Sequence, residues 1–200
     1  MASSFNTKQQ EENLNSKIVV ALERISEAFR VLLWNESKET ALSPIQIQLL
    51  IFLLFHTKNA GTVSYLAKEF NMSKATISDS IKVLLKKELV QKEKNPKDTR
   101  SFIVTLTPNG LSVAKKAASF ANVIEKPFDK LSPEKKDIIY NSLLSVINDL
   151  NRSGIITVQR MCFSCVHYKL QDNHHYCGLL QKPLATKALR VDCPEHELAV

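Results

Sequence analysis

The sequence predicts a mainly helical fold that carries one small β-hairpin and is followed by a separate cysteine-rich module. Three observations support this fold class. Apolar residues recur at helical spacing over most of the chain before residue 151, glycine is scarce at 4 of 200 residues, and all four cysteines lie after residue 160. We therefore divide the chain into a flexible N-terminus at 1–12, a main domain at 13–151 and a C-terminal module at 155–200.

Two helices are predicted at the start of the main domain. Residues 14–34 form an amphipathic helix, because their apolar side chains return every three or four positions. The next helix, 44–55, begins after Ser43, a good N-cap, with Pro44 in the first helical position. It is apolar on nearly every side, which is typical of a helix buried at the centre of a domain.

A pair of short helices follows, at 63–70 and 74–87. Thr62 and Ser73 each precede one of them and can act as its N-cap. The second helix keeps its apolar residues on a single stripe, so its opposite face is polar. Two helices joined by a turn of about three residues are typical of a helix-turn-helix.

Residues 89–94 and 101–106 are predicted to pair as a β-hairpin. Apolar and polar side chains alternate in the second segment, which is the period of a half-buried strand. The linking residues 95–99 include asparagine, proline and aspartate, which favour turns. A helix-turn-helix followed by a hairpin with a basic tip defines a winged helix-turn-helix, and the hairpin is its wing.

Two further helices complete the main domain. Thr107 followed by Pro108 opens the first, which we expect to run to about Glu125. Ser132 repeats this start signal ahead of a proline, and the second helix is expected to continue to about Asn151. The second of these helices has a continuous apolar face.

Basic charge is concentrated in one quarter of the chain. The whole sequence carries a net charge of +7. Between residues 63 and 116 there are eleven lysines and arginines but only five acidic residues, so this stretch holds nearly all of the excess. Such a concentration is expected of a surface that binds phosphates, and it indicates double-stranded DNA as the partner.

The helix at 74–87 is the candidate recognition helix, because the major groove admits one α-helix. We rank Lys74, Thr76 and Ser78 highest, since the first turn of such a helix usually makes the base contacts. At the wing, Arg100 is the candidate for the minor groove, with Asp98 expected to hold its guanidinium. The alternative is an ordinary solvated helix face. The full set of predicted DNA-binding residues is Ser73, Lys74, Thr76, Ser78, Asp79, Lys82, Lys94, Lys97, Asp98 and Arg100.

Residues 66–110 contain four motifs, Leu66-Ala67, Leu84-Leu85-Lys86-Lys87, Asp98-x-Arg100 and Leu106-Thr107-x-x-Gly110. In these motifs the segment resembles the MarR family of bacterial transcription regulators, and the order of the flanking helices extends the resemblance to roughly 14–150. One departure is Glu88, where the family commonly has glycine to turn from the recognition helix into the strand. The resemblance implies a homodimer in which the helices at 14–34 and 108–151 intertwine, a palindromic DNA site and a small aromatic or phenolic effector.

The four cysteines have the spacing Cys162-x2-Cys165-x11-Cys177-x15-Cys193, outside the part that resembles the family. Cys-x2-Cys lets two thiolates face one ion, and two more complete a tetrahedron. Structural zinc is the leading interpretation. The alternatives are an iron–sulfur cluster, a thiol redox switch and four unrelated cysteines. Either of the first two would make the protein a redox-sensing regulator.

Histidine is the other zinc ligand that this segment offers. Four of the five histidines lie in it, at His167, His174, His175 and His196. We interpret them as surface residues or as residues that support the ligands. His174 or His175 is the first candidate to replace a cysteine that proves free.

The sequence contains no motif that indicates an enzyme. A phosphate-binding glycine loop, a nucleophile elbow and a His-Glu-x-x-His motif are all missing from it. A catalytic zinc site usually mixes ligand types and keeps an open position, so we expect a regulator and not a zinc enzyme. A protein–protein adaptor is the third alternative. No apolar run approaches the roughly 20 residues that span a bilayer, so we expect a cytoplasmic protein without a membrane partner.

Overall fold

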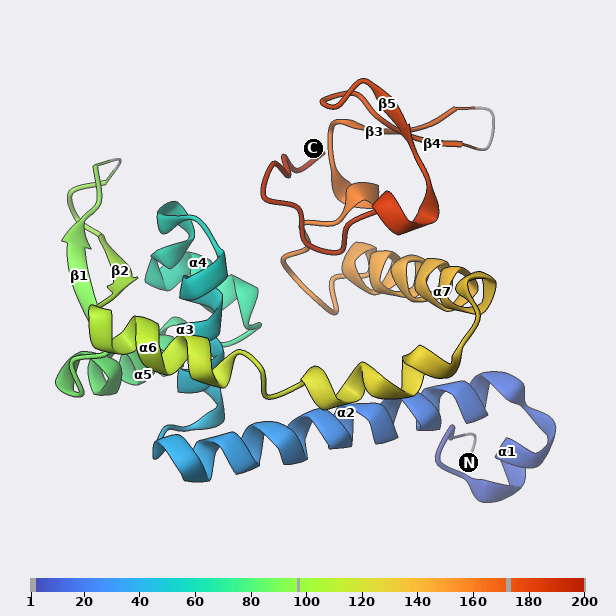
Figure 1. The fold of residues 1–200 in the computed structure, drawn as a ribbon, viewed down its shortest axis with the longest axis horizontal. Coiled ribbons are helices and arrows are strands. Elements are labelled where there is room, and N and C mark those ends of the chain that lie inside the picture. Colours follow the sequence, from blue (N-terminus) through green and yellow to red (C-terminus); the bar gives the residue numbers. More distant parts are fainter. Residues whose placement is uncertain (1–2, 97, 172–173, 200) are drawn as a thin grey trace.

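The computed structural model describes residues 3–96, 98–171 and 174–199. One long helix, α2 (Leu14–Thr40), runs along one side of the molecule, and the short helix α1 (Thr7–Glu12) lies at its N-terminal end (Figure 1). The winged helix lies over the opposite end of α2, and the cysteine module occupies the far corner above α7 (Pro133–Arg152). The chain thus forms two lobes, each with its own core.

Helix α3 (Pro44–Phe55) is the centre of the first lobe, as its composition predicted. Ile47, Leu49 and Leu50 are completely buried, and α6 (Pro108–Ala117) packs against the helix. Its start is fixed by a capping box in which Ser43 and Gln46 bond to each other's backbone. Within the described ranges no single helix is long and apolar enough to cross a membrane; α2 and α3 satisfy that description only together, bent by 91°.

The helix-turn-helix consists of α4 (Val63–Glu69) and α5 (Lys74–Lys86), and the wing consists of β1 (Val90–Lys94) and β2 (Phe102–Leu106). The two strands are antiparallel in the predicted hairpin register. Both helices begin at the predicted caps, where the Thr62 and Ser73 hydroxyls each accept a hydrogen bond from the backbone N–H group three residues further on. Local sequence signals therefore place these four elements within about one residue.

The passage from α5 to β1 explains two of the motif residues. Glu88 has φ of 55°, so this position needs the left-handed conformation that favours glycine, and here glutamate adopts it. Gly110 lies against the Leu89 carbonyl so closely that a Cβ would stand 1.7 Å from its oxygen. The Thr107 hydroxyl caps α6 and donates to the Glu88 carbonyl at 2.7 Å, so α6 is fastened directly to the turn.

Two of the predicted helix ends were wrong. Helix α2 continues past residue 34 to Thr40 and ends at Ala41 in the left-handed conformation. Helix α6 stops at Ala117, well before Glu125, and short 3-10 turns at Asn122–Ile124 and Lys126–Lys130 follow. Phe120 explains the early end: its N–H bonds the Ala117 carbonyl at 3.1 Å, and its ring packs against the main core.

The C-terminal module has strands that the sequence did not predict. Three short strands form one antiparallel sheet, β3 (Tyr168–Gln171), β4 (His174–Cys177) and β5 (Lys182–Leu184). Short 3-10 turns at Cys162–Ser164 and Thr186–Ala188 flank it. A second small core joins the module to α7 and consists of Leu144, Met161, Leu184 and Leu189.

Candidate nucleic-acid interface and cysteine module

Helix α5 divides into a buried face and an exposed face. Ile77, Ile81 and Leu84 are buried in the core of the winged lobe. The opposite face carries most of the residues predicted to contact DNA. Lys74, Thr76, Asp79 and Lys82 are exposed, and Ser78 is half-buried.

Part of this exposed face is occupied by contacts within the helix. The Ser73 and Thr76 hydroxyls lie 2.9 Å apart, and Ser73 also accepts from the Thr76 N–H. Lys82 Nζ lies 2.8 Å from Asp79 Oδ1. Ser73 therefore has a structural role as the N-cap of α5. The Asp79 carboxylate partly neutralises the positive charge of Lys82.

The wing lies at the same end of the molecule as α5, since the helix leads directly into β1 (Figure 1). The expected pair is formed: Arg100 Nε lies 3.5 Å from Asp98 Oδ1, and the Arg100 side chain is 94% exposed. Lys94 is also exposed. Lys97 lies outside the described residues. The tip thus combines an extended arginine with one carboxylate that limits its freedom.

The structure adds basic residues near the wing that the sequence reasoning did not select. Lys58 Nζ lies 2.9 Å from Glu93 Oε2 on β1, although the two residues are far apart in the sequence. Glu93 also accepts from Thr105 on β2 at 2.7 Å. Lys92 places its ammonium 4.2 Å from the centroid of the Phe102 ring. These contacts join the two strands to each other and to the turn before α4.

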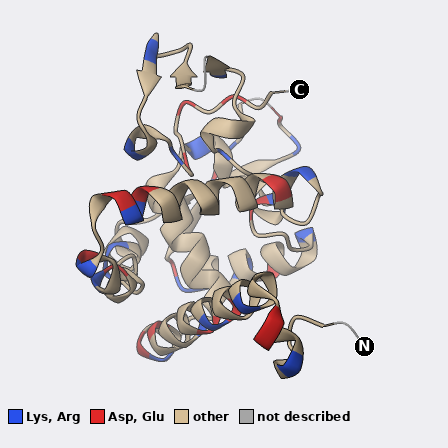
Figure 2. Ribbon diagram, turned by 90° about the vertical axis from the view of Figure 1, so that its right-hand side faces the viewer, with Lys and Arg blue, Asp and Glu red and all other residues tan. Residues whose placement is uncertain are grey.

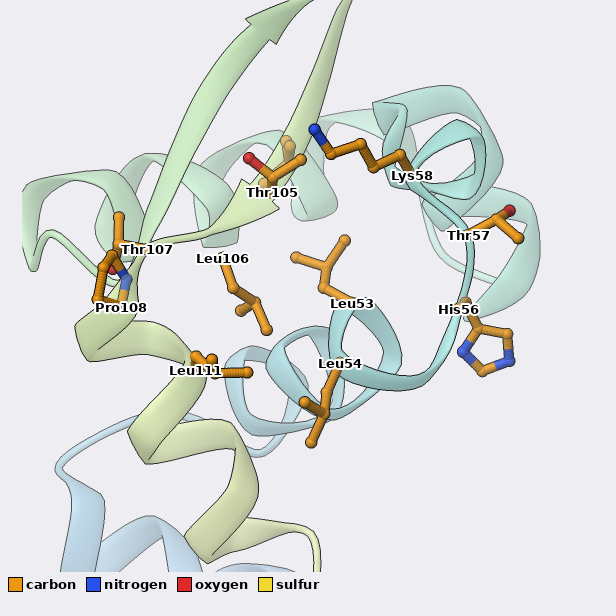
Figure 3. A pocket seen from close by; sticks show the side chains of 11 residues that line it. Leu53, Leu54, His56, Thr57, Lys58, Thr105, Leu106, Thr107, Pro108 and Leu111 are labelled. Atoms are coloured by element: carbon orange, nitrogen blue, oxygen red, sulfur yellow. The ribbon is translucent and has the colours of Figure 1, made fainter.

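A pocket of about 430 Å³ opens between the end of α3, β2 and the start of α6. Figure 3 shows leucine side chains from all three elements converging on it, with Thr105 and Lys58 on its far side. Its volume falls in the range of small-molecule sites. The leucines are Leu53, Leu54, Leu106 and Leu111.

All four cysteines line one small cavity of about 30 Å³ in the C-terminal module. The described residues do not assemble three or more cysteine, histidine or acidic side chains into a ready metal-binding group. The Arg190 N–H bonds Cys162 Sγ at 3.3 Å, and Arg190 Nη1 lies 3.8 Å from Cys193 Sγ. Burial raises the pKa of the Cys193 thiol, which donates to Glu195 at 3.3 Å.

The four histidines of the module have different surroundings. His174 is exposed, and His175 Nδ1 lies 2.7 Å from the Tyr168 hydroxyl with its ring stacked on Phe163. His196 contacts Ser164 at 3.0 Å. His167, by contrast, lines the cysteine cavity. The structure therefore brings His167, and not His174 or His175, to the thiols.

A cluster of charged residues joins the two lobes, and the sequence reasoning missed it. Arg160 makes a two-point ion pair with Glu69 of α4, with N–O distances of 2.6 and 3.1 Å. On its other side Arg160 Nε lies 2.6 Å from Asp192 Oδ1, and Asp192 Oδ2 lies 2.7 Å from His56 Nε2. The Tyr65 hydroxyl accepts from Arg160 at 2.9 Å. We call these five residues the Arg160 cluster.

Burial and charge oppose each other within this cluster. Burial by itself would lower the pKa of Arg160, but hydrogen bonds from its guanidinium to Glu69 and Asp192 raise it above the ordinary value. Burial would likewise raise the pKa of Asp192, yet the hydrogen bonds from Arg160 and His56 hold it below its usual range. Both groups are therefore charged and mutually dependent, which is the state expected of a partly buried ion-pair network.

The helix-turn-helix and the hairpin together form a winged helix-turn-helix. Residues 42–101 match the model of the MarR family. This match spans α3 to β1 and ends before β2, and it supports the resemblance for that part of the winged helix. The expectation of a transcription regulator agrees with this match and with the description of one relative.

Similar proteins agree with this family. The chain is 24% identical over 100 residues to the HTH-type transcriptional regulator SarZ of Staphylococcus haemolyticus (strain JCSC1435), which covers 50% of this chain and 67% of that protein. A MarR protein from Peptoclostridium difficile DA00132 matches with a TM-score of 0.60 and 24% identity over 71% of this chain and 92% of that chain. MepR of S. aureus in complex with DNA matches with a TM-score of 0.56 and 20% identity over 66% and 96%. At these identities the structural likeness concerns the fold.

Proposed function

We propose that this protein is a DNA-binding transcription regulator that binds a palindromic duplex site as a homodimer. The observation that carries the proposal is the exposed polar face of α5, which lies beside a basic hairpin in a winged helix of the MarR type. In this proposal α5 enters the major groove and Arg100 enters the minor groove. The relatives support it, since one is described as a transcriptional regulator and another is bound to DNA.

Exposed apolar faces on α2 and α7 support the homodimer. Leu14 is 69% exposed and Ile138 is 66% exposed, and other large apolar side chains continue along each helix. In Figure 2 the charged residues of α7 gather at its two ends, so the stretch between Asp137 and Asp149 is uncharged. Faces of this kind are typical of association sites, and a second copy of the chain supplies matching helices. The other exposed members are Ile18, Leu22, Ile25, Phe29, Ile139, Leu143, Val146 and Leu150.

The DNA-binding proposal is tested by selecting duplexes from genomic fragments and measuring their affinity at several salt concentrations. Specific binding through phosphate contacts is expected to weaken steeply as salt rises. Arg100→Ala is expected to weaken binding to all sequences, whereas Thr76→Ala is expected to relax the sequence preference. Arg24→Gln, which alters an exposed ion pair on α2, is the matched control. Recovery of no duplex, together with affinity that does not depend on salt, contradicts the proposal and favours an adaptor.

We further propose that the module holds one structural zinc ion through Cys162, Cys165, Cys177 and Cys193. The four thiols already line one small cavity, and four cysteine thiolates are a common ligand set for structural zinc. Metal binding then requires the thiols to converge from their present positions. His167 Nε2 is buried without a hydrogen bond, 3.8 Å from a Glu197 oxygen, which makes His167 the nearby substitute ligand.

Metal analysis and an absorption spectrum of anaerobically purified protein test this site. One zinc per chain in a colourless solution is the expected result. A brown solution that absorbs at about 400 nm contradicts zinc and indicates an iron–sulfur cluster instead. Protein without metal, whose thiols form disulfides reversibly, supports the thiol-switch alternative.

The pocket beside the wing is our candidate for the effector site. Its leucine lining and the single ammonium of Lys58 suit a small apolar or aromatic acid. A set of aromatic carboxylates screened by thermal shift against the full-length protein tests this proposal, with Leu111→Trp as the variant that fills the pocket. Stabilisation that persists in Leu111→Trp places the ligand elsewhere.

A further inference from the structure

We infer that the cysteine module controls DNA binding through the Arg160 cluster, which transmits the metal state of the module to helix α4. The inference rests on the proposed function, because it needs both a metal in the module and DNA on the winged helix. Its new element is the connection between them. Three structural features carry it: the position of Arg160 beside two cysteines, its contacts with α4, and the path of the linker.

The first feature is the position of Arg160 within the module. Cys162 lies two residues after Arg160. The Arg160 carbonyl accepts a hydrogen bond from the Cys193 N–H at 2.9 Å. Arg160 and Asp192 also form a parallel β-bridge. The backbone of Arg160 is therefore attached to both of these cysteines. When the thiols converge on an ion or separate after its loss, the backbone of Arg160 moves with them.

The second feature is the contact of the Arg160 side chain with the helix-turn-helix. Its guanidinium bonds Glu69 at two points and Tyr65 at one, and both residues belong to α4. The Arg160 and Glu69 side chains are only 17% and 15% exposed. The guanidinium carbon also lies 5.5 Å from the centroid of the Phe52 ring of α3. Since a two-point arginine–carboxylate pair has strict geometry, a shift of Arg160 either carries α4 along or breaks the pair.

The third feature is the linker between α7 and Arg160, which crosses the same helix. Asn71 Nδ2 donates to the Ile155 carbonyl at 3.3 Å, and the Thr157 hydroxyl donates to the Lys68 carbonyl. Asn71 lies in the turn between α4 and α5, with φ of 53°. The linker thus contacts the C-terminal end of α4, and the Arg160 cluster contacts the Tyr65 and Glu69 side chains of the same helix. Helix α4 packs on α5, so this hold extends to the recognition helix.

These contacts set the direction of the effect. With the metal in place, the module holds α4 and α5 in one arrangement before DNA arrives. Without it, the Arg160 cluster still forms, as in this structure, but the module holds Arg160 less rigidly. More of the ordering of α4 must then be supplied on binding, which weakens affinity. Loss of the metal is therefore expected to raise the Kd for DNA, by about 5-fold or more if the coupling is of ordinary size.

The test compares the full-length protein loaded with zinc and the same protein depleted by a chelator, with DNA affinity and zinc content measured in parallel. For the unchanged chain the depleted form is expected to bind DNA about 5-fold more weakly or worse. In Arg160→Met one zinc per chain is retained, but the ratio of the two affinities falls to near one. Glu69→Gln, which breaks the pair from the α4 side and is distant in sequence from every cysteine, is expected to give the same loss. Arg24→Gln is the matched control and keeps the full ratio.

The outcomes separate the inference from the proposed function. If the chain binds zinc and DNA but depletion leaves the affinity unchanged or tighter, the inference is overturned and the proposed function stands. If Arg160→Met and Glu69→Gln both fold, as judged by circular dichroism, and retain the full ratio, the coupling does not pass through Arg160 and the inference is again overturned. If Arg160→Met does not fold, Glu69→Gln decides. Absence of zinc binding or of DNA binding defeats the proposed function, and the inference fails with it.

Discussion

The two lobes of this protein are stabilised in different ways. The winged lobe surrounds α3 with a continuous apolar core in which Ile47, Leu49 and Leu50 have no exposed surface. Within the described part of the cysteine module, Met161, Leu184 and Leu189 are the buried apolar residues of a small core, which Leu144 of α7 completes. Small domains with so little apolar core usually need a metal or disulfides. The same chain thus combines a lobe that is stabilised by burial with a lobe whose small core lies beside four thiols.

The largest expected effect comes from removing a thiol. Cys162→Ser is expected to abolish tight zinc binding and unfold the module, because structural zinc contributes about 10 kcal/mol or more to such folds. The winged lobe is expected to keep its thermal transition, since its core shares no residue with the module. Limited proteolysis of residues 155–199 and calorimetry of the whole chain measure the two parts separately. A module that resists protease equally well in Cys162→Ser contradicts the idea that metal replaces its core.

A smaller effect is expected from cavities in the two cores. Leu50→Ala is expected to lower the free energy of unfolding of the winged lobe by about 3 kcal/mol, as for other large-to-small core changes. Leu144→Ala removes the only α7 side chain that is fully buried against the module. It is expected to loosen the contact of the module with α7 while the main transition stays in place. Denaturant unfolding at one fixed protein concentration measures the loss of stability in each variant, and hydrogen exchange then assigns it to one lobe or the other. Equal destabilisation of both lobes in either variant would show that they unfold as one unit.

The Arg160 cluster provides the next test, because it lies where the two lobes meet. Glu69→Ala leaves Arg160 with only Asp192 as its carboxylate partner and is expected to cost about 2 kcal/mol, the scale of a hydrogen bond to a charged group. Thermal unfolding of both lobes measures it, and Lys82→Ala, which removes an exposed ion pair on α5, is the control. A cost no larger than that of the control would show that the cluster contributes little to stability.

The smallest expected effect concerns the turn after α5. Glu88→Gly is expected to stabilise the winged lobe by up to about 1 kcal/mol, because Glu88 has φ of 55° and glycine adopts this conformation without strain. Its neighbour Gly110 gives the opposite expectation, since a methyl group there would collide with the Leu89 carbonyl. A chemical denaturation midpoint that falls in Glu88→Gly, or stays unchanged in Gly110→Ala, contradicts this description of the turn.

Much of the winged lobe could be predicted because its signals are local. Ser43, Thr62, Ser73 and Thr107 precede helices that begin where their hydroxyls can cap them. Alternation within 101–106 similarly predicted the second strand of the wing. The predicted end of a helix was wrong where a distant contact determined it. Helix α6 ends early because the Phe120 ring packs against the main core, and no residue near Ala117 indicates this end in the sequence.

The candidate sites also combine features that are local in the sequence with features that depend on distant contacts. The amphipathic pattern of α5, the basic wing and the spacing of the cysteines follow from the sequence alone, because periodicity, charge and spacing are properties of short segments. The tertiary structure was needed to show that the four thiols line one cavity, that His167 reaches it, and that Arg160 pairs with Glu69 across 91 residues of sequence. An ion pair or a shared cavity depends on which distant segments the packing of the core brings together, and local propensities do not contain this information.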